Sequence, residues 1–492
     1  MFNRSSGILL HISSLPSKHG IGDLGREAYQ FVDFLHKSGQ RFWQILPIGP
    51  TSYGDSPYQS LSTFAGNPLF VNLKFLQKEG LLHKKDFKKR DFGSNASKVD
   101  FAKVHQEKMQ LLRLAFAKTN TKQLEKVLLF AQANKKWLDD YALFMALKQD
   151  NNLKSWQLWP KQIRDRNPKA IKKAFIKHAD EIAFWQFVQY HFFQQWNQLK
   201  AYANEKGVEI IGDIPIYVAE DSADVWANPK LFLLDKSNKP THVAGCPPDA
   251  FSENGQLWGN PIYNWPRMEK QGFKWWINRI RFSFQMHDVV RIDHFRGFEA
   301  YWSIPGNSDT AAHGNWIKGP EMKLFSAIKK ELGDLRIIAE DLGFLTQEVI
   351  DFKNATGYPG MKILEFAFDS KEDSDYLPHN YEKKCFVYTG THDNDTVLGW
   401  VKNAPKKDLK KAKQYFQLTK KEGYHWGFIR GAWASVGNVA IAQMQDFLGL
   451  GTKSRMNIPS TIGDNWMWRM KPKQLTKKLQ KRTKKLTKLY GR

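Results

Sequence analysis

The chain has 492 residues and a mass of 57.1 kDa, and 42% of its residues are hydrophobic. No apolar run approaches the ~18 residues of a membrane-spanning helix, and the N-terminus lacks the pattern of a secretory signal. Two cysteines, Cys246 and Cys385, are too few for a disulfide framework, and their spacing fits no metal-binding motif. A reducing cytoplasm is therefore the expected location.

The formal net charge is +25. Such a charge can indicate nucleic-acid binding, but the basic residues are scattered and no nucleic-acid motif accompanies them, so nucleic acid is not an expected partner. The tail at 471–492 holds ten Lys/Arg and no acid, and the spacing of its leucines predicts a basic amphipathic helix. These leucines are Leu475, Leu479, Leu486 and Leu489. We expect this helix to dock on the core; weak contact with an anionic membrane or polymer is the alternative.

Eight short apolar runs rich in β-forming residues recur along the chain. They lie at 7–12, 42–47, 208–213, 289–293, 336–340, 361–366, 385–389 and 439–442. Several are continuous rather than alternating, as expected for strands buried on both faces. Helical patterns follow the fourth and fifth runs, at 320–331 and 346–354. The pattern predicts an α/β fold, a (β/α)₈ TIM barrel forming one catalytic domain over 1–492. The competing open doubly wound sheet lacks a glycine-rich phosphate loop after any strand.

Two long segments interrupt this pattern. The first, about 74–205, lies between the second and third strands and has long helical periodicity at 124–149 and 181–206, so we expect a helical insertion that rides on the barrel. The second, about 217–275, follows the third strand and is rich in Pro, Gly, Asn and aromatic residues. Long loops within compact domains are usually functional. We expect this loop-rich insertion to cover the cleft.

Three acids stand where predicted strands end: Asp293, Glu340 and Asp393, after the fourth, fifth and seventh runs. In parallel α/β folds, the carboxyl ends of strands are where catalytic groups gather. Retaining glycoside cleavage needs two carboxyl groups about 5–5.5 Å apart. The three acids therefore predict glycosidic chemistry.

The neighbours of two of these acids suggest their roles. Arg291 precedes Asp293 by two residues, so both side chains project from one side of the strand. We expect the guanidinium to lower the pKa of Asp293 and keep this nucleophile ionised. Glu340 follows an apolar stretch and has no adjacent cation, so desolvation should raise its pKa and suit it to general acid/base work.

Asp393 is then the third carboxylate, which holds sugar hydroxyls and the cationic transition state. His392 and His294 are the expected hydrogen-bond donors to ring hydroxyls. A barrel that uses strand-end acids to hold Mg²⁺ for proton abstraction would show a similar scatter. That alternative needs a Lys or His base opposite the metal and gives Arg291 no role.

At these residues the chain resembles the 4-α-glucanotransferases, or amylomaltases, of glycoside hydrolase family 77 in the α-amylase superfamily. VVRIDHFRG, AEDLG and TGTHDNDT are similar to the nucleophile, acid/base and transition-state segments. GDIPIYVAEDSADVW resembles the segment that places an aspartate, here Asp213, under the reacting sugar. The resemblance runs from Ser6 to about Arg469, so the lysine-rich tail lies outside it.

Two further stretches resemble segments of this family alone. In the block at 43–68, Ser56 and Tyr58 match positions that contact sugar. In the block at 246–265, which resembles a loop overhanging the cleft, the matching positions are Asp249, Phe251 and Trp258. One departure is Ala250, where some members carry tyrosine. The segment at 455–466 resembles the family's closing segment, with Ile458 and Ser460 where threonine and glycine are common.

The resemblance implies a retaining double displacement through a covalent glycosyl-enzyme, with α-1,4-glucans and maltooligosaccharides as donors and a glucan or glucose as acceptor. It implies no cofactor, no obligatory metal, and a cytoplasmic role in maltodextrin, starch or glycogen metabolism. An oligomeric state is not predicted.

The carboxylates alone do not decide between sugar and water as acceptor. The aromatic stretch at 251–265 favours transfer, because an apolar cover shields the intermediate from water and stacks on an acceptor sugar. An α-glucan hydrolase is the alternative enzyme, and a non-catalytic glucan-binding protein is the alternative of another class. The pairs Trp275/Trp276 and Trp466/Trp468 are expected in the core.

Overall fold

A computed structural model describes residues 2–52, 54–248, 254–343, 345–369 and 374–492. Eight parallel strands form one sheet in the order β10-β11-β12-β1-β2-β3-β6-β9. Their bounds are β1 Ser5–Leu9, β2 Phe42–Gln44, β3 Glu209–Pro215, β6 Val289–Asp293, β9 Ile337–Ala339, β10 Gly360–Ile363, β11 Cys385–Tyr388 and β12 Val439–Gln443. Each of the eight predicted runs coincides with one of these strands, which confirms the fold prediction.

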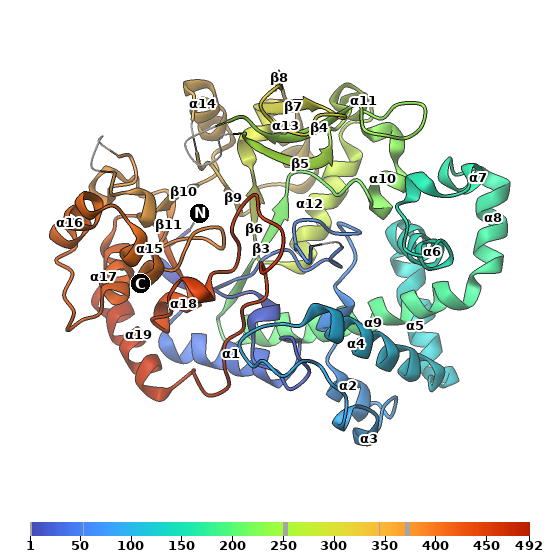
Figure 1. Ribbon diagram of the computed structural model, residues 1–492, viewed down its shortest axis with the longest axis horizontal. Helices are drawn as coiled ribbons and strands as arrows, with labels where there is room; N and C mark the ends of the chain where they lie inside the picture. Colours follow the sequence, from blue (N-terminus) through green and yellow to red (C-terminus); the bar gives the residue numbers. More distant parts are fainter. Residues whose placement is uncertain (1, 53, 249–253, 344, 370–373) are drawn as a thin grey trace.

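The sheet closes on itself where its two outermost strands meet. The backbone N–H of Ala339, the last residue of β9, donates to the carbonyl of Pro359, just before β10, at 3.0 Å. Strands β1, β2, β9, β11 and β12 are buried along their whole length. Closure therefore explains why the sequence shows continuous apolar runs: both faces of the strands are covered. Figure 1 shows these strands at the centre of the molecule, with helices around them.

Helices cover the outside of the barrel. These include α1 Arg26–Ser38, α12 Lys274–Met286, α13 Glu321–Leu332, α14 Gln347–Thr356 and α17 Tyr424–Ala434. The helices predicted at 320–331 and 346–354 are α13 and α14, displaced by one or two residues, and both predictions are confirmed. α1 ends at Gly39, whose φ of 77° is the left-handed conformation that terminates helices.

The chain between β2 and β3 is mainly helical and forms one end of the molecule in Figure 1. Its helices are α2 Leu73–Lys78, α3 Lys84–Lys88, α4 Phe101–Ala117, α5 Thr121–Ala133, α6 Lys135–Asp150, α7 Lys161–Arg164, α8 Pro168–Lys177 and α9 Ala179–Glu205. The periodicity at 124–149 belongs to two helices, α5 and α6, which meet at Asn134. α9 runs 27 residues and reaches the barrel, where Trp196 Nε1 donates to the carbonyl of Met286 at 3.1 Å.

A second sheet lies at the carboxyl end of the barrel strands. It is antiparallel, with the order β5-β4-β7-β8. β4 His242–Cys246 and β5 Gln256–Pro261 come from the loop-rich segment, together with helices α10 Ala223–Ala227 and α11 Trp265–Lys270, whereas β7 Ala300–Pro305 and β8 Asn315–Lys318 follow β6. We call it the cover sheet. Its four strands were not predicted.

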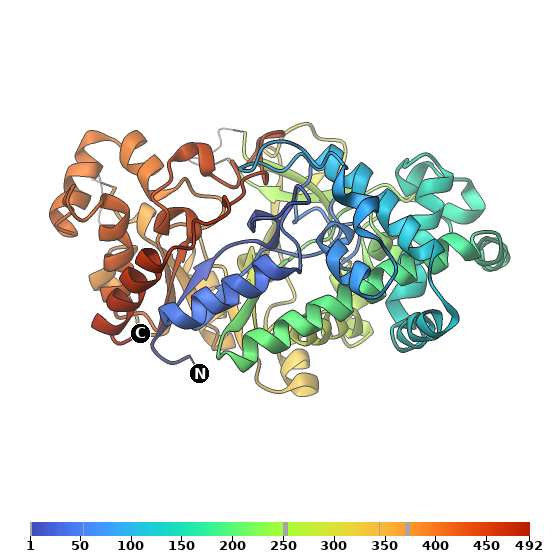
Figure 2. The ribbon, with the colours of Figure 1, turned by 90° about the horizontal axis from the view of Figure 1, so that it is seen from below.

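The last part of the chain holds α15 Val397–Asn403, α16 Lys406–Tyr415, α18 Met444–Phe447 and α19 Lys477–Leu489. Figure 2 shows α19 beside α1, and the amide of Gln40, two residues beyond α1, donates to Thr487 Oγ1 at 2.9 Å. Leu475, Leu479 and Leu486 are partly buried against the core, but Leu489 is 69% exposed, so the prediction that it docks on the core with the other leucines is wrong. The buried residues of α19 are Thr483 and Thr487, and Leu489, two residues after Thr487, is turned about 200° away from it toward solvent.

Candidate active site

The three predicted carboxylates lie together at the carboxyl end of the barrel. Asp293 ends β6, Glu340 directly follows β9, and Asp393 lies in the loop after β11. Their charges act on one another: Asp293 raises the pKa of Glu340, and Asp393 raises that of Asp293. The structure therefore brings together side chains that are up to 100 residues apart in the sequence.

The buried guanidinium of Arg291 binds two carboxylates of this site. One of its nitrogens, Nη1, donates to both carboxylate oxygens of Asp213 at 2.8 and 2.7 Å, and Nη2 lies 3.0 Å from Asp293 Oδ1. The hydroxyl of Tyr58 donates to Asp213 Oδ2 at 2.8 Å. Burial lowers the pKa of Arg291, but Asp213 and Asp293 outweigh it and leave that pKa well above its usual value. One permanent cation thus holds two carboxylates in fixed positions.

The predicted contact between Arg291 and Asp293 is present, but the predicted direction of the pKa shift is wrong. Burial raises the pKa of Asp293 to about 6, and Arg291 opposes this only in part. The carboxylates of Asp213 and Asp393 also raise it. These two groups come from other strand ends, so local sequence could not reveal them. Asp293 is still mainly ionised at neutral pH.

Glu340 has the raised pKa that the sequence predicted. Burial raises it to about 8, and the nearby Asp293 adds to the shift. Arg291 and two backbone donors act in the opposite direction: the N–H of His294 binds Oε2 at 2.6 Å and that of Leu342 binds Oε1 at 3.1 Å. These two bonds fix the orientation of the carboxyl group. A carboxyl group that carries its proton at neutral pH can act as a general acid.

Asp393 is held by a segment that the sequence reasoning did not assign to the site. Asn457 Nδ2 donates to Asp393 Oδ1 at 2.6 Å, and Nη2 of Arg455 donates to the backbone carbonyl of Asp393. His392 Nε2 lies 3.4 Å from Asp393 Oδ2. Both missed residues belong to the segment at 455–466, whose resemblance to the family's closing segment was the available signal.

A second group of buried acids lies against the loop that carries Asp393. Asp446 accepts from Thr389 Oγ1 at 2.7 Å and from the N–H of Val397 at 2.8 Å, and so joins both ends of the loop. Burial raises the pKa of Asp446 to about 7 and that of Glu365 well above its usual value; Asp395 adds to both shifts. Glu365 and Asp446 lie just beyond β10 and β12, so they satisfy the same strand-end rule that identified the catalytic acids.

Aromatic rings line the space above the carboxylates. Tyr58 stacks on His392 with 5.1 Å between ring centroids, and the largely buried Trp466 lies 5.8 Å from Tyr58. Trp258 meets His294 edge-on at 4.8 Å. Nε2 of His294 is buried without a hydrogen-bond partner. Burial lowers the pKa of this histidine to about 3, so the ring is neutral. An unpaired buried polar atom on the residue next to Asp293 is suited to a ligand hydroxyl.

The other predicted contacts are only partly accounted for. Ser56 lies near Tyr58, but its hydroxyl accepts from the N–H of Tyr58 at 3.2 Å and so shapes the loop. Asp249 and Phe251, with the departure at Ala250, lie outside the described residues. The tryptophans expected in the core, Trp276, Trp466 and Trp468, are buried, whereas Trp275 is half-buried.

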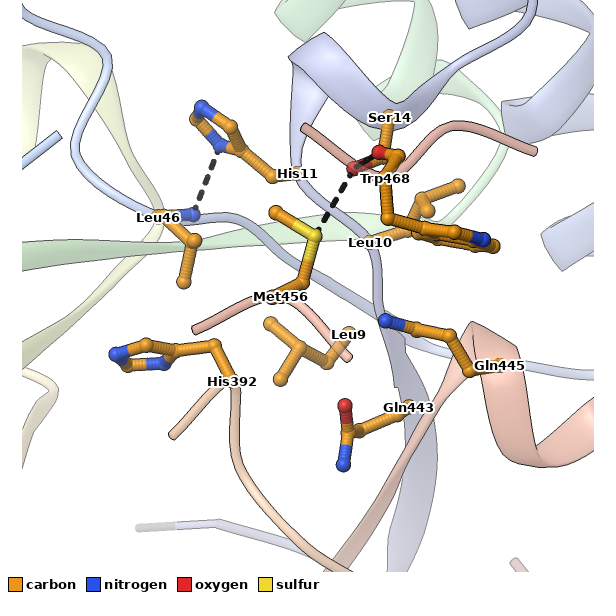
Figure 3. A pocket seen from close by; sticks show the side chains of 10 residues that line it. All are labelled: Leu9, Leu10, His11, Ser14, Leu46, His392, Gln443, Gln445, Met456 and Trp468. Carbon is orange, nitrogen blue, oxygen red and sulfur yellow. Dashed lines mark hydrogen bonds between the residues drawn. The ribbon is translucent and has the colours of Figure 1, made fainter. Parts of the chain in front are cut away.

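A small cavity of about 10 Å³ lies behind His392, and Figure 3 shows the ten side chains that line it. This is roughly the volume that one water molecule needs. Across the cavity, Nδ1 of His11 accepts from the N–H of Leu46 at 3.2 Å, and burial lowers the pKa of His11 to about 3. His11 therefore stays neutral near pH 7.

No helix in the described part of the chain is long and apolar enough to cross a membrane. Nor do the described residues contain a cluster of three His, Cys, Asp or Glu side chains arranged to hold a metal ion.

Known proteins match this chain over nearly its full length. The family profile described as 4-alpha-glucanotransferase matches residues 10–476. The 4-alpha-glucanotransferase of Clostridium butyricum is 55% identical over 98% of this chain and 100% of its own length. The chain belongs to the 4-alpha-glucanotransferase family. It is accordingly a glycosyltransferase-type enzyme with 4-alpha-glucanotransferase activity.

Solved structures agree with this family assignment. The amylomaltase from Streptococcus agalactiae, in complex with acarbose, is 43% identical and superposes with a TM-score of 0.97 over 99% of both chains. Among the sequence relatives, the 4-alpha-glucanotransferase of Thermus thermophilus is 45% identical over 96% of each sequence. The amylomaltase from Corynebacterium glutamicum, 19% identical with a TM-score of 0.80, shares the fold. The resemblance seen in the sequence motifs is thus confirmed over nearly the full length of this glucanotransferase.

Proposed function

We propose that the enzyme transfers segments of α-1,4-glucan by a retaining double displacement, with Asp293 as nucleophile and Glu340 as general acid and base. The observation that carries this assignment is the difference in protonation between two neighbouring carboxyl groups. Asp293 is paired with Arg291 and has a pKa of about 6, whereas burial raises the pKa of Glu340 to about 8. Near neutral pH one is an anion and the other carries a proton, as this reaction requires.

In the first step a carboxylate oxygen of Asp293 attacks the anomeric carbon of the donor. The glycosidic bond breaks, and Glu340 gives its proton to the departing glucan oxygen. In the second step the hydroxyl of an acceptor sugar gives its proton to Glu340 and attacks the anomeric carbon, which releases Asp293. Each step inverts the anomeric centre, so the α-configuration is retained.

We assign the remaining polar groups to holding the sugar. Asp393 stabilises the positive charge that develops at the reacting ring and, with His392 and His294, binds its hydroxyls. Asp213, fixed by Arg291 and Tyr58, lies under the same ring. Ser56 with Tyr58 and Trp258 with Asp249 and Phe251 are the further substrate contacts that we propose, as the family motifs imply.

Transfer rather than hydrolysis follows from the cover over the site. The segment at about 217–275 supplies Trp258, whose ring meets His294, and the amide of Gln59 donates to its carbonyl at 3.3 Å. An aromatic cover excludes water from the glycosyl-enzyme and offers an acceptor sugar a surface for stacking. We propose that this segment covers the cleft, while the helical insertion at about 74–205 and the tail helix support the single catalytic barrel at 1–492.

We further propose that the natural substrates are maltooligosaccharides and starch- or glycogen-like glucans, that no metal or cofactor takes part, and that the enzyme works in the cytoplasm. Cys246 and Cys385 are not joined by a disulfide, which suits a reducing compartment. We do not assign nucleic acid as a partner, because a neutral glucan needs none.

Incubation with pure maltotriose tests the proposal. Free glucose, total reducing ends and product lengths are followed together. Transfer yields glucose and longer maltodextrins while reducing ends stay constant. Reducing ends that rise in step with shorter products would identify a hydrolase and overturn the argument from the cover. If maltotriose does not react at all, both enzyme functions, transferase and hydrolase, are contradicted. The alternative that then remains is a glucan-binding protein.

A further inference from the structure

One aromatic surface lies outside the site described above, on the hairpin of β7 and β8. Trp302 and Trp316 are partners across the two strands, with 5.3 Å between ring centroids and 62° between ring planes. Trp316 is 42% exposed and is the only exposed tryptophan among the described residues. Tryptophan is enriched at binding surfaces, because its ring offers a large apolar face and a polar N–H.

The two tryptophans differ in their structural roles. Trp302 packs against the small cluster of Val243, Ile304 and Ala311 and donates from Nε1 to the carbonyl of Ala311 at 2.8 Å. Trp316 belongs to neither this cluster nor the main core, and every residue of β8 is exposed. Core packing therefore explains Trp302 but not Trp316.

Arg296 connects Trp316 to the catalytic group. Its guanidinium carbon lies 4.0 Å from the centroid of the Trp316 ring, a cation–π contact. Arg296 follows Asp293 by three residues, and its charge interacts with that of Glu340. The side chain of Arg296 thus connects the exposed ring of Trp316 to the surroundings of Glu340.

The hairpin is also joined to the cover over the cleft. The N–H of Ala311, in the β7–β8 connection, donates to the carbonyl of Asn254 at 3.1 Å. At Gly314 a β-carbon would come within 2.5 Å of the Trp302 ring, so only glycine lets the connection pass so close. These contacts fix the β7–β8 connection, and the hairpin itself belongs to the cover sheet, which also carries Trp258 on β5.

We propose that Trp316, held by Arg296, is a distal contact for long α-glucans. Its ring would stack on the apolar face of glucose units that extend beyond the cleft, as sugar rings stack on aromatic side chains elsewhere. Lys318, two residues further along β8, projects from the same exposed face as Trp316, and its ammonium group, which is paired with Glu299, can also donate to sugar hydroxyls. The proposal rests on the proposed function and adds a preference for chain length: only a chain long enough to leave the cleft gains from this contact.

The test compares two donors in Trp316→Ala, namely maltotriose and amylose of several tens of glucose units. We expect the ratio of the KM for amylose to the KM for maltotriose to rise about three- to tenfold, the loss of one stacking contact. Ile317→Ala is the matched control, because Ile317 is equally exposed at 42% but is the next residue on β8 and so projects from the opposite face. Trp316→Phe should recover most of the change.

An unchanged ratio in Trp316→Ala, or an equal change in Ile317→Ala, would overturn the proposal. Trp316→Thr is a second variant that suits an edge strand, in case the alanine variant does not fold. Binding of the same two glucans to Glu340→Gln, with and without the Trp316 change, gives a readout without turnover, and only amylose binding should weaken. If the unmodified enzyme transfers nothing from maltotriose, the proposed function fails; if it does but the ratio stays constant, only the distal contact fails.

Discussion

Asn457 binds the loop of Asp393 twice: its side-chain amide donates to Asp393 Oδ1 at 2.6 Å, and its backbone N–H donates to the carbonyl of His392 at 3.2 Å. Arg455 strengthens this connection, since its Nε donates to the carbonyl of Asn457 at 2.7 Å while Nη2 binds the carbonyl of Asp393. A segment more than 60 residues away in sequence therefore sets the orientation of one carboxylate.

Asn457→Ala removes only the side-chain bond. A hydrogen bond to a charged group contributes about 1.5–3 kcal/mol, so we expect kcat/KM on maltotriose to fall by about 10- to 100-fold, with little change in thermal unfolding. Asn457→Asp should be worse at neutral pH, because it places a second negative charge against Asp393, and should recover partly as the pH falls. Equal activity of the alanine variant and the unmodified enzyme would show that Asp393 is oriented by other groups.

Asp293→Asn and Glu340→Gln replace the two reacting carboxyl groups without changing their size. Each should reduce kcat by several orders of magnitude, because the covalent and proton-transfer steps act as one unit. Unfolding curves should show that both variants fold. In Glu340→Gln, donors with a good leaving group should still form the glycosyl-enzyme, since they need no proton. Near-normal turnover by either variant would refute the roles assigned here.

The pH dependence of kcat/KM should be bell-shaped. The reaction needs Asp293 ionised, which fails as the pH falls through about 6, and Glu340 protonated, which fails as the pH rises through about 8. The two groups interact, so the limbs report the pair rather than single residues. Initial rates at low maltotriose concentration, with unfolding measured at each pH, separate catalysis from stability. A flat profile between pH 5 and 9 would contradict this assignment.

Sequence reasoning reached the barrel and the catalytic acids because both depend on local patterns. An apolar run followed by an acid is visible at Asp293 and Glu340 without knowledge of the fold. Asn457 was missed because its partner is distant in the chain. The shift of Asp293 was predicted in the wrong direction because burial and the charges of Asp213 and Asp393 arise only when strands assemble.

The cover sheet shows the same limit. β4 and β5 lie in a stretch rich in Pro, Gly and Asn, where strand patterns are weak, and β4 pairs with β7, which follows another barrel strand. β4 and β7 can pair only because the barrel brings together the segments that follow β3 and β6. Local sequence patterns therefore predict the barrel, whereas the cover sheet depends on contacts between segments distant in the chain.

Trp258→Ala tests the part that the cover takes in choosing between acceptors. The ring meets His294 edge-on, and its removal would open the site to water and remove a stacking surface. We expect the ratio of transfer to hydrolysis on maltotriose to fall about 3- to 10-fold, the effect of one aromatic contact. Reducing-end and product-length assays measure the two reactions together. A constant ratio, even with slower turnover, would remove the cover from the account of transfer.

Asp446 links the stability of the enzyme to pH. Burial raises its pKa to about 7, from an ordinary value of 3.8, so the folded state holds this proton more tightly than the unfolded state. Below about pH 4 both states are protonated and nothing is lost; between 4 and 7 stability falls as the unfolded state ionises first, by about 4 kcal/mol at most. Asp446→Asn removes this titration, so the variant should gain stability relative to the parent as the pH rises from 4 to 7. Denaturant unfolding at several pH values measures the difference, with exposed Asp334→Asn as control, and a difference that does not vary with pH would show that Asp446 is ionised in the folded enzyme throughout.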